Sequence, residues 1–314
     1  CYSYSLSLTI TRNTNNLSNC QLVKRQHVGD KLNFNKEFGN LSYMKIVMIG
    51  SGNLATNLAK ALKNAGNDII QVVSRTMESA SMLAKTIGAS AITDISHTCL
   101  DADIYIFSVK DSVLESCIKS VAERVGHNKI MVHTAGSISM DVFSGHANRF
   151  GVFYPMQTFS KQRKVNFESI PVFIESSDNE TLDMLHNLAN QITEYVYILD
   201  SEKRRHLHLS AVWACNFVNH CYCVAAKILE YSGLPFSVMH ALIDETADKV
   251  KTMHPSDAQT GPAVRYDENV IARQHSMMSD VPLQAELYDL MSRSIHQFSK
   301  EKEGEDHPQS QIRK

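Results

Sequence analysis

A cluster of small residues follows the first strongly apolar run of the chain and has the spacing of a phosphate-binding turn. The segment KIVMIGSGNLA extends from Lys45 to Ala55. Gly50 allows a tight turn at the end of a strand, and Gly52 lets the backbone approach a pyrophosphate. A turn of this kind holds the phosphates of a dinucleotide when it joins a strand to a helix. The residues expected to contact them are Gly50, Ser51, Gly52, Asn53 and Leu54.

The end of the next apolar run, Asp68–Val73, indicates which dinucleotide is bound. An NAD site usually has an acid there for the ribose 2′-hydroxyl, whereas an NADP site offers Arg and small hydroxyl residues to a 2′-phosphate. This chain has Ser74, Arg75 and Thr76, and no carboxylate before Glu78. We therefore predict NADP, with NAD less favoured, and contacts from these three residues. The alternative makes Arg75 a solvated cation and Thr76 a helix N-cap, a role compatible with phosphate binding.

Polar residues also stand at the ends of later apolar runs. Ligands of open α/β sheets gather at the carboxyl ends of the strands, so these residues are expected to line the cofactor and the cleft beside it. Capping of the following loop or helix is the alternative for each of them. The further cofactor candidates are Ser108, Val109, Lys110, His133 and Thr134.

Hydride transfer also needs a group that gives or takes a proton beside the reacting carbon. Imidazole suits this role near neutral pH, and His208 is the candidate. Because His208 lies on a mostly apolar helix face, the alternative is a buried histidine that forms hydrogen bonds within the core. Gln157 follows a predicted strand, and Asn216 on the helix of His208 is suited to hold a carboxamide or a polar group of the substrate. The predicted catalytic group is His208, Gln157 and Asn216.

A turn between two later helices offers a second set of polar groups. Thr260 and Arg265 flank the dipeptide Gly261-Pro262, and a hydroxyl and a guanidinium together suit a substrate carboxylate. We expect both residues to bind substrate. An ordinary capping turn, with Arg265 paired to Asp267 or Glu268, is the alternative.

Alternating strand and helix patterns position the first set of residues. Up to Leu199 they predict an α/β fold, a doubly wound sheet that is parallel at least in its first half. From Ser201 the pattern is helical, with one long helix expected from Arg205 to about Tyr231, so an all-α domain follows. The predicted divisions are a disordered or non-native extension over 1–43, a dinucleotide-binding domain over 44–199, a helical substrate and dimerisation domain over 200–300 and a tail over 301–314.

Composition excludes several other classes of protein. The 314 residues are 43% hydrophobic and 20% charged with a formal net charge of −2, which predicts neither a nucleic-acid partner nor a membrane partner. The seven cysteines are scattered without a Cys-x-x-Cys pair, so no metal site is expected and reduced thiols in the cytoplasm are the simplest interpretation. A homodimer is expected because the wide apolar faces of the helical region, which include Trp213, Phe217 and Tyr222, exceed what a thin domain buries alone.

The order of these domains resembles the superfamily of 6-phosphogluconate dehydrogenase, pyrroline-5-carboxylate reductase and ketopantoate reductase. The chain is most similar to a bacterial group of Rossmann-like proteins with an uncharacterised C-terminal domain, often described as deazaflavin-dependent NADP oxidoreductase-like. The matching segments are Ile49–Asn53, Val132–Ser137, Phe153–Ser160, His208–Val212 with Ala214–Phe217, and Thr260–Pro262.

This resemblance implies an NADP-dependent oxidoreductase without naming its substrate. We expect a small carbonyl, imine or hydroxy acid to react in a cleft between the domains. The β-hydroxyacid dehydrogenases place a Lys one helical turn before an Asn, whereas here Val212 and Trp213 precede Asn216 at that spacing and Cys215 precedes Asn219. The alternative function is therefore a non-catalytic NADP(H)-binding sensor or scaffold.

Overall fold

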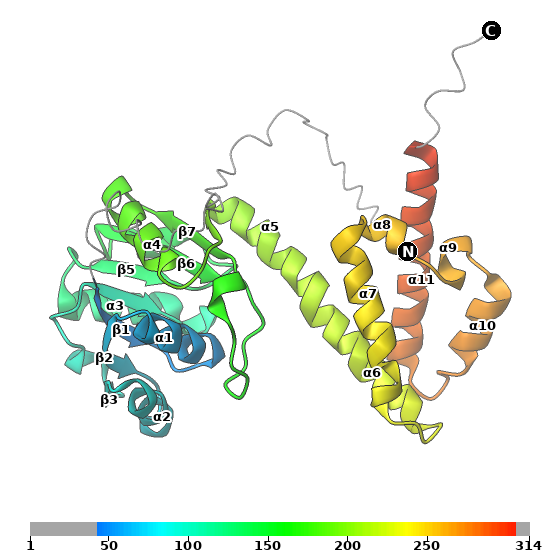
Figure 1. Ribbon diagram of the computed structural model, residues 1–314, viewed down its shortest axis with the longest axis horizontal. Helices are drawn as coiled ribbons and strands as arrows, with labels where there is room; N and C mark the ends of the chain where they lie inside the picture. The colour runs from blue at the N-terminus through cyan, green and yellow to red at the C-terminus, as the bar shows by residue number, and fades with distance from the viewer. Residues whose placement is uncertain (1–42, 306–314) are drawn as a thin grey trace, which may run out of the picture. The chain divides into compact units, whose positions relative to one another are not determined.

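The computed structural model describes residues 43–305 (Figure 1). The predicted extension, apart from Tyr43, and the last part of the predicted tail lie outside the described residues. The chain forms two compact units that meet in sequence between Cys215 and Asn216. The helical residues 201–215 thus belong to the same unit as the sheet. The sequence pattern placed the domain boundary earlier, near residue 200.

An eight-stranded sheet forms the first unit. Its order is β3-β2-β1-β4-β5-β6-β7-β8, and every neighbouring pair is parallel except β6 and β7. The strands are β1 (Lys45–Ile49), β2 (Asp68–Val73), β3 (Ser90–Ile92), β4 (Ile104–Phe107), β5 (Ile130–His133), β6 (Arg149–Pro155), β7 (Val172–Ser176) and β8 (Val196–Ile198).

The central strands are apolar on both faces because helices cover both faces of the sheet. In β1, Ile46 and Met48 face one core and Val47 and Ile49 face the other. Leucines of α1, α2 and α4 pack in the first core, and Leu114 of α3 packs in the second. These helices are α1 (Asn53–Asn64), α2 (Met77–Ile87), α3 (Asp111–Val125) and α4 (Asn179–Asn190).

Local sequence signals set the ends of the first two helices. Ala65 is the C-cap of α1, and Gly66 follows it with φ 101°, a positive value that favours glycine at a helix end. Thr76 caps α2, because its hydroxyl accepts a hydrogen bond from the backbone N–H of Ser79. The cap interpretation of Thr76 is therefore correct.

Helices make up the rest of the described chain. The predicted single helix from Arg205 consists of α5 (Ser201–Ala211), a π-helical segment (Val212–Phe217) and α6 (Val218–Glu230). The predicted continuous helix is thus observed, but it begins at Ser201 and contains a π-helical segment, whose extra residues rotate the faces that follow. The remaining helices are α7 (His240–Thr252), α8 (Pro255–Ala258), α9 (Pro262–Arg265), α10 (Glu268–Ser276) and α11 (Pro282–Glu305). Among the described residues, no helix combines the length and the apolar character that crossing a bilayer requires.

Candidate functional site

The glycine turn lies at the carboxyl end of β1, pressed between its neighbouring strands. Gly50 has φ +116° and donates its N–H to the carbonyl of Val73 over 2.8 Å. A Cβ on Gly50 would lie 2.1 Å from the carbonyl oxygen of Ser108 on the other side. Gly52 is exposed, with no atom within 4 Å of the position that a Cβ would take, and is the N-cap of α1 without any side-chain cap. The first N–H groups of a twelve-residue helix thus suit a pyrophosphate.

The end of β2 carries the groups expected to select the cofactor. The Ser51 and Ser74 hydroxyls hydrogen-bond each other over 2.7 Å, which ties the glycine turn to this strand end. The Arg75 side chain is exposed. Glu78 lies in the first turn of α2, where a negative charge interacts favourably with the helix dipole. The donor set of one guanidinium and neighbouring hydroxyls fits a 2′-phosphate better than a 2′-hydroxyl.

The ends of β4 and β5 are joined to each other. Thr134 donates its backbone N–H to the carbonyl of Phe107 over 3.0 Å, and the Thr134 side chain is buried. Ser108 and Val109 are partly exposed, and Lys110 is the exposed N-cap of α3. Along this edge, Ser108, Val109 and Lys110 have surface available for a ligand.

His133 supports the loop after β5 instead of facing a ligand. Its imidazole has no exposed surface: Nδ1 accepts the N–H of Ala135 at 3.1 Å, and Nε2 lies 3.4 Å from the Ser139 carbonyl. Burial, together with the neighbouring Arg204 guanidinium, lowers its pKa to about 3. The imidazole is therefore neutral near pH 7. The expected contact between this side chain and a cofactor is not available, because both ring nitrogens are used within the loop.

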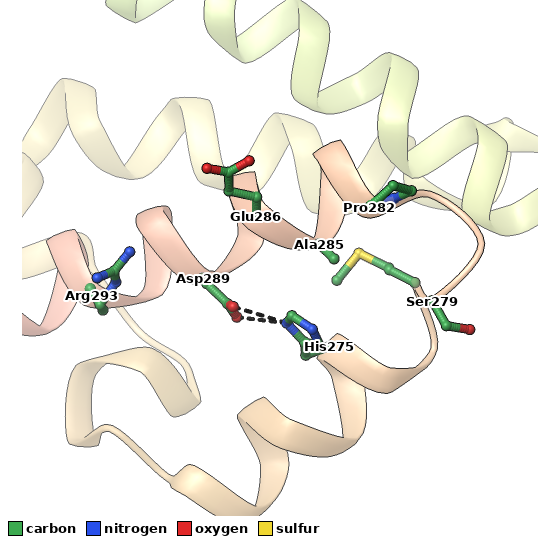
Figure 2. Close-up of a pocket in the computed structure, with 8 residues that line it drawn as sticks. His275, Ser279, Pro282, Ala285, Glu286, Asp289 and Arg293 are labelled. Atoms are coloured by element: carbon green, nitrogen blue, oxygen red, sulfur yellow. Dashed lines mark hydrogen bonds and ion pairs between the residues drawn. The ribbon is translucent and has the colours of Figure 1, made fainter. Parts of the chain in front are cut away.

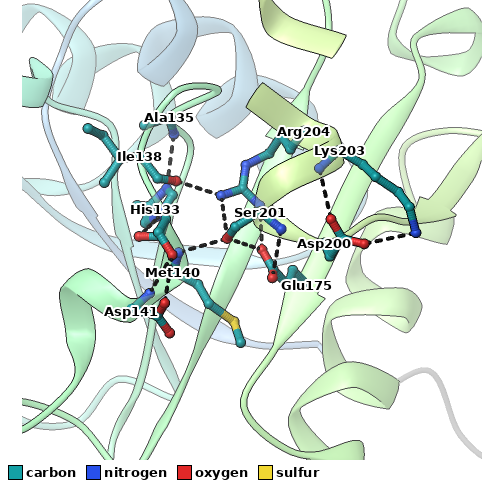
Figure 3. A network of polar contacts seen from close by, with 11 residues as sticks. His133, Ala135, Ile138, Met140, Asp141, Glu175, Asp200, Ser201, Lys203 and Arg204 are labelled. Carbon is teal, nitrogen blue, oxygen red and sulfur yellow. Dashed lines mark hydrogen bonds and ion pairs between the residues drawn. The ribbon is translucent and has the colours of Figure 1, made fainter. Parts of the chain in front are cut away.

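Arg204 connects the start of α5 to two parts of the sheet unit (Figure 3). Its side chain is 1% exposed and forms an ion pair with Glu175 of β7. Its Nη2 donates to the Ile138 carbonyl at 2.5 Å and to the Ser201 hydroxyl at 3.0 Å. The Ser201 hydroxyl in turn donates to Glu175 over 2.7 Å. This network was not predicted from the sequence, because an arginine among the charged residues of a helix start carries no sign of burial.

His208 lies one helical turn after Arg204 and contacts two strand ends. Its Nδ1 is 3.0 Å from the Tyr154 hydroxyl at the end of β6. Gly136, in the loop after β5, is buried, and a Cβ there would lie 2.5 Å from the same Nδ1. Burial raises the pKa of Tyr154, so its hydroxyl keeps its proton. The structure thus brings His208 to the edge of the sheet where the cofactor candidates lie.

The other two catalytic candidates are not joined to His208 by any hydrogen bond within residues 43–305. The Gln157 Oε1 atom accepts the Thr158 N–H at 2.7 Å, so the amide caps its own loop. Asn216 is exposed and is the first residue of the second unit. Both assignments remain predictions.

The helical unit places the substrate candidates on its surface. Thr260 and Arg265 are exposed, and Gly261 between them has φ +108°. A separate hollow of about 350 Å³ lies in this unit, and two of its lining residues, His275 and Asp289, approach to 2.9 Å between ring nitrogen and carboxylate oxygen. Figure 2 shows how these residues face each other. Neither Thr260 nor Arg265 lines this hollow, so the predicted substrate contacts and the hollow are different places.

Two family models match consecutive parts of the chain. Residues 45–136 match the family "NADP oxidoreductase coenzyme F420-dependent", and residues 170–295 match "Domain of unknown function (DUF2520)". The glutamyl-tRNA reductase of Idiomarina loihiensis is 33% identical over 78 residues, which are 24% of this chain and only 18% of that enzyme.

Solved structures match the chain over most of its length. A Bacteroides fragilis protein described as a candidate NADP oxidoreductase is 51% identical, with a TM-score of 0.79 over 82% of this chain and 100% of that one. An imine reductase from Myxococcus stipitatus in complex with NADP+ shares the fold at 14% identity, with a TM-score of 0.59 over 82% of this chain and 94% of that one. The predicted fold class, a doubly wound Rossmann domain followed by a helical region, is confirmed. Half of all aligned residues are shared with a relative matched from end to end, and the chain therefore belongs to the family of two-domain NADP oxidoreductases, whose cofactor is NADP.

Proposed function

We propose that this protein is an NADP-dependent oxidoreductase that reduces a small carbonyl or imine, or oxidises the corresponding hydroxy acid or amine. The observation that carries the proposal is the position of His208 against Gly136, at the carboxyl end of β5. The strands lie in the order β2-β1-β4-β5. Arg75 follows β2, where the adenosine is expected to bind, and the glycine turn follows β1, where the pyrophosphate is expected to bind. The nicotinamide then belongs over β4 and β5, beside His208.

The residues of this chain have separate roles in that proposal. Gly52 and the start of α1 bind the pyrophosphate, and Arg75 binds the 2′-phosphate. When bound, NADPH supplies the hydride. His208 supplies the proton that the substrate oxygen or nitrogen takes up, and Gln157 and Asn216 are assigned to hold polar groups of the substrate or the nicotinamide carboxamide. Thr260 and Arg265 are assigned to a substrate carboxylate.

Turnover of NADPH tests the proposal directly. The purified protein is mixed with NADPH and a panel of ketones, cyclic imines and keto acids, and loss of NADPH absorbance is followed. Cyclic imines belong in the panel because an imine reductase shares the fold. Consumption of NADPH with one substrate class supports the oxidoreductase. Tight NADPH binding without turnover of any compound would instead support the sensor or scaffold, which the missing lysine before Asn216 favours.

Replacement of Arg75 by Ala should weaken NADPH binding by ~1.5–3 kcal/mol, the scale of a charged hydrogen bond, which is about 10- to 150-fold in Kd. NADH lacks the 2′-phosphate, so its affinity should change little. Fluorescence titration of both cofactors measures the difference. Lys85→Ala is the matched control, because it removes one exposed positive charge from the other end of α2. Equal losses for NADPH and NADH would contradict the role of Arg75.

A homodimer through the helical unit is the next prediction. Among its described residues only two hydrophobic side chains, Met278 and Ala285, are buried, which is too small a core for a stable unit. Leu242, Leu283 and Leu290 are 58%, 62% and 48% exposed. Light scattering at micromolar concentration should give twice the 35.2 kDa of one chain.

A negative charge on the exposed apolar surface of the helical unit should dissociate the predicted homodimer. Leu242→Glu is expected to shift the mass toward the monomer, since it places a charge in an apolar interface. Met82→Glu on α2 makes a similar change at a side chain 59% exposed in the sheet unit, and should leave the mass unchanged. A wild-type mass of one chain would exclude the dimer.

We infer a cytoplasmic location from the cysteines. The five within the described residues, Cys99, Cys117, Cys215, Cys221 and Cys223, are free thiols, as expected in a reducing compartment.

A further inference from the structure

Tyr154 and His208 form a pair whose geometry assigns different roles to the two imidazole nitrogens. The Tyr154 hydroxyl lies 3.0 Å from Nδ1, and the two rings meet edge to face with centroids 6.1 Å apart and planes at 73°. Nδ1 is therefore occupied. Within the described residues Nε2 of His208 takes part in no hydrogen bond, and the side chain is partly exposed. Nε2 is the ring nitrogen available to a ligand.

The position of the imidazole is fixed from three directions. Gly136 lies directly beneath it, where a Cβ would come within 2.5 Å of Nδ1 and 2.6 Å of Cγ, so only glycine leaves this space. The backbone of α5 is fixed one turn earlier, where the buried Arg204 binds Glu175 and the Ile138 carbonyl. Tyr154 itself is only 7% exposed at the end of β6 and cannot swing freely. A half-turn of the ring would put a carbon in place of Nδ1 and lose this hydrogen bond, so the hydroxyl favours the orientation with Nδ1 inward.

Proton exchange through Nε2 also requires a particular tautomer. A neutral imidazole that accepts a proton at Nε2 carries its hydrogen on Nδ1. An acceptor beside Nδ1 stabilises this form, and the Tyr154 oxygen can accept the Nδ1–H while burial keeps the phenol protonated. The same Nδ1–H bond persists when His208 becomes an imidazolium with a second hydrogen on Nε2. The pair therefore suits proton transfer in either direction.

We propose that Tyr154 is a positioning residue that holds His208 by Nδ1 and presents Nε2 to the substrate. This inference rests on the proposed function. In reduction, the hydride forms a C–H bond at the substrate carbon and the electron pair of the C=O or C=N bond moves to oxygen or nitrogen. That atom takes the proton from Nε2 as the Nε2–H bond breaks. His208 is left neutral, with Nδ1–H still donated to Tyr154, and solvent returns the proton to Nε2.

The tautomer of His208 tests the pair without any substrate. Long-range ¹H–¹⁵N spectra of the full chain are recorded for the wild type and for Tyr154→Phe, with His208→Gln identifying the signals. We expect the Nδ1–H form in the wild type and a change to Nε2–H, the form that an unconstrained imidazole prefers, in Tyr154→Phe. Gly136→Ala, with folding checked by circular dichroism, should produce the same change by displacing the ring. An unchanged His208 signal in Tyr154→Phe would overturn the proposal.

Kinetics on the first substrate that consumes NADPH provide the second measurement. His208→Gln should lower kcat by about 100-fold and Tyr154→Phe by about tenfold, with the KM for NADPH unchanged in both. Tyr105→Phe is the matched control: it removes a hydroxyl that donates to the Cys99 carbonyl over 2.7 Å, and should leave kcat and the His208 signal unchanged. An unaltered kcat in Tyr154→Phe would overturn the positioning role. If the tautomer changes as expected but no substrate consumes NADPH, the proposed reaction fails and the Tyr154–His208 contact stands.

Discussion

Replacement of Gly50 by Ala is expected to lower the free energy of unfolding by about 2–5 kcal/mol and to abolish NADPH binding. Two costs act together. Gly50 has φ +116°, a conformation that side chains rarely adopt, and its Cβ would lie 2.1 Å from the backbone oxygen of Ser108. Backbone on both sides prevents relief, because Gly50 also donates its N–H to Val73. Urea unfolding followed by circular dichroism, together with NADPH titration, measures both effects.

Gly52→Ala separates the fold from the cofactor. Gly52 has φ −71°, and a Cβ at this position would have no atom within 4 Å, so the variant should keep the wild-type stability. NADPH affinity should still fall, because the methyl group stands where the pyrophosphate approaches the start of α1. The prediction fails if Gly50→Ala unfolds at the wild-type urea concentration, or if Gly52→Ala binds NADPH as tightly as the wild type.

Replacement of Arg204 by Met should cost about 3–5 kcal/mol of stability, the range for removing one partner of a buried ion pair. Glu175, whose side chain is 13% exposed, would lose its cation, and the Ile138 carbonyl would lose a donor. Methionine has a similar length and keeps most of the packing, so the loss of stability measures the effect of removing the charge. Urea unfolding of the sheet unit provides the measurement.

Arg205→Met is the matched control for this variant. Arg205 is the next residue of α5 and is exposed, so the same substitution there should change stability by less than about 0.5 kcal/mol. The double variant Arg204→Met with Glu175→Leu should recover part of the loss, because no unpaired charge remains buried. Equal stability of the Arg204→Met and Arg205→Met proteins would show that the buried ion pair contributes nothing.

The sequence alone determined the parts of the site that depend on near neighbours in the chain. The run KIVMIGSGNLA combines a buried strand, a glycine turn and a helix start within eleven residues, so its conformation follows from local sterics. The glycine stop at Gly66 and the cap at Thr76 are local in the same sense. The absence of an acid after β2 likewise indicated NADP, the cofactor of the family to which the chain belongs.

The tertiary structure decided which distant residues meet. Tyr154 and His208 are 54 positions apart, and their contact requires β6 to pair with β5 and α5 to begin beside the loop that follows β5. No helical or strand period contains that information. The sequence also assigned His133 to the cofactor because of its place at a strand end, whereas burial turned its imidazole into a support for the loop.

Burial of charge and changes of helical period escaped the sequence for a related reason. Arg204 and Arg205 are adjacent and alike in type, yet one is buried with Glu175 and the other is exposed, because only the tertiary contacts of α5 distinguish them. The π-helical turn from Val212 to Phe217 is also invisible to a periodicity that assumes α-helical spacing. Local sterics therefore fixed the cofactor turn in the sequence, whereas the surroundings of His208 depend on long-range packing that brings separate strands and a helix together.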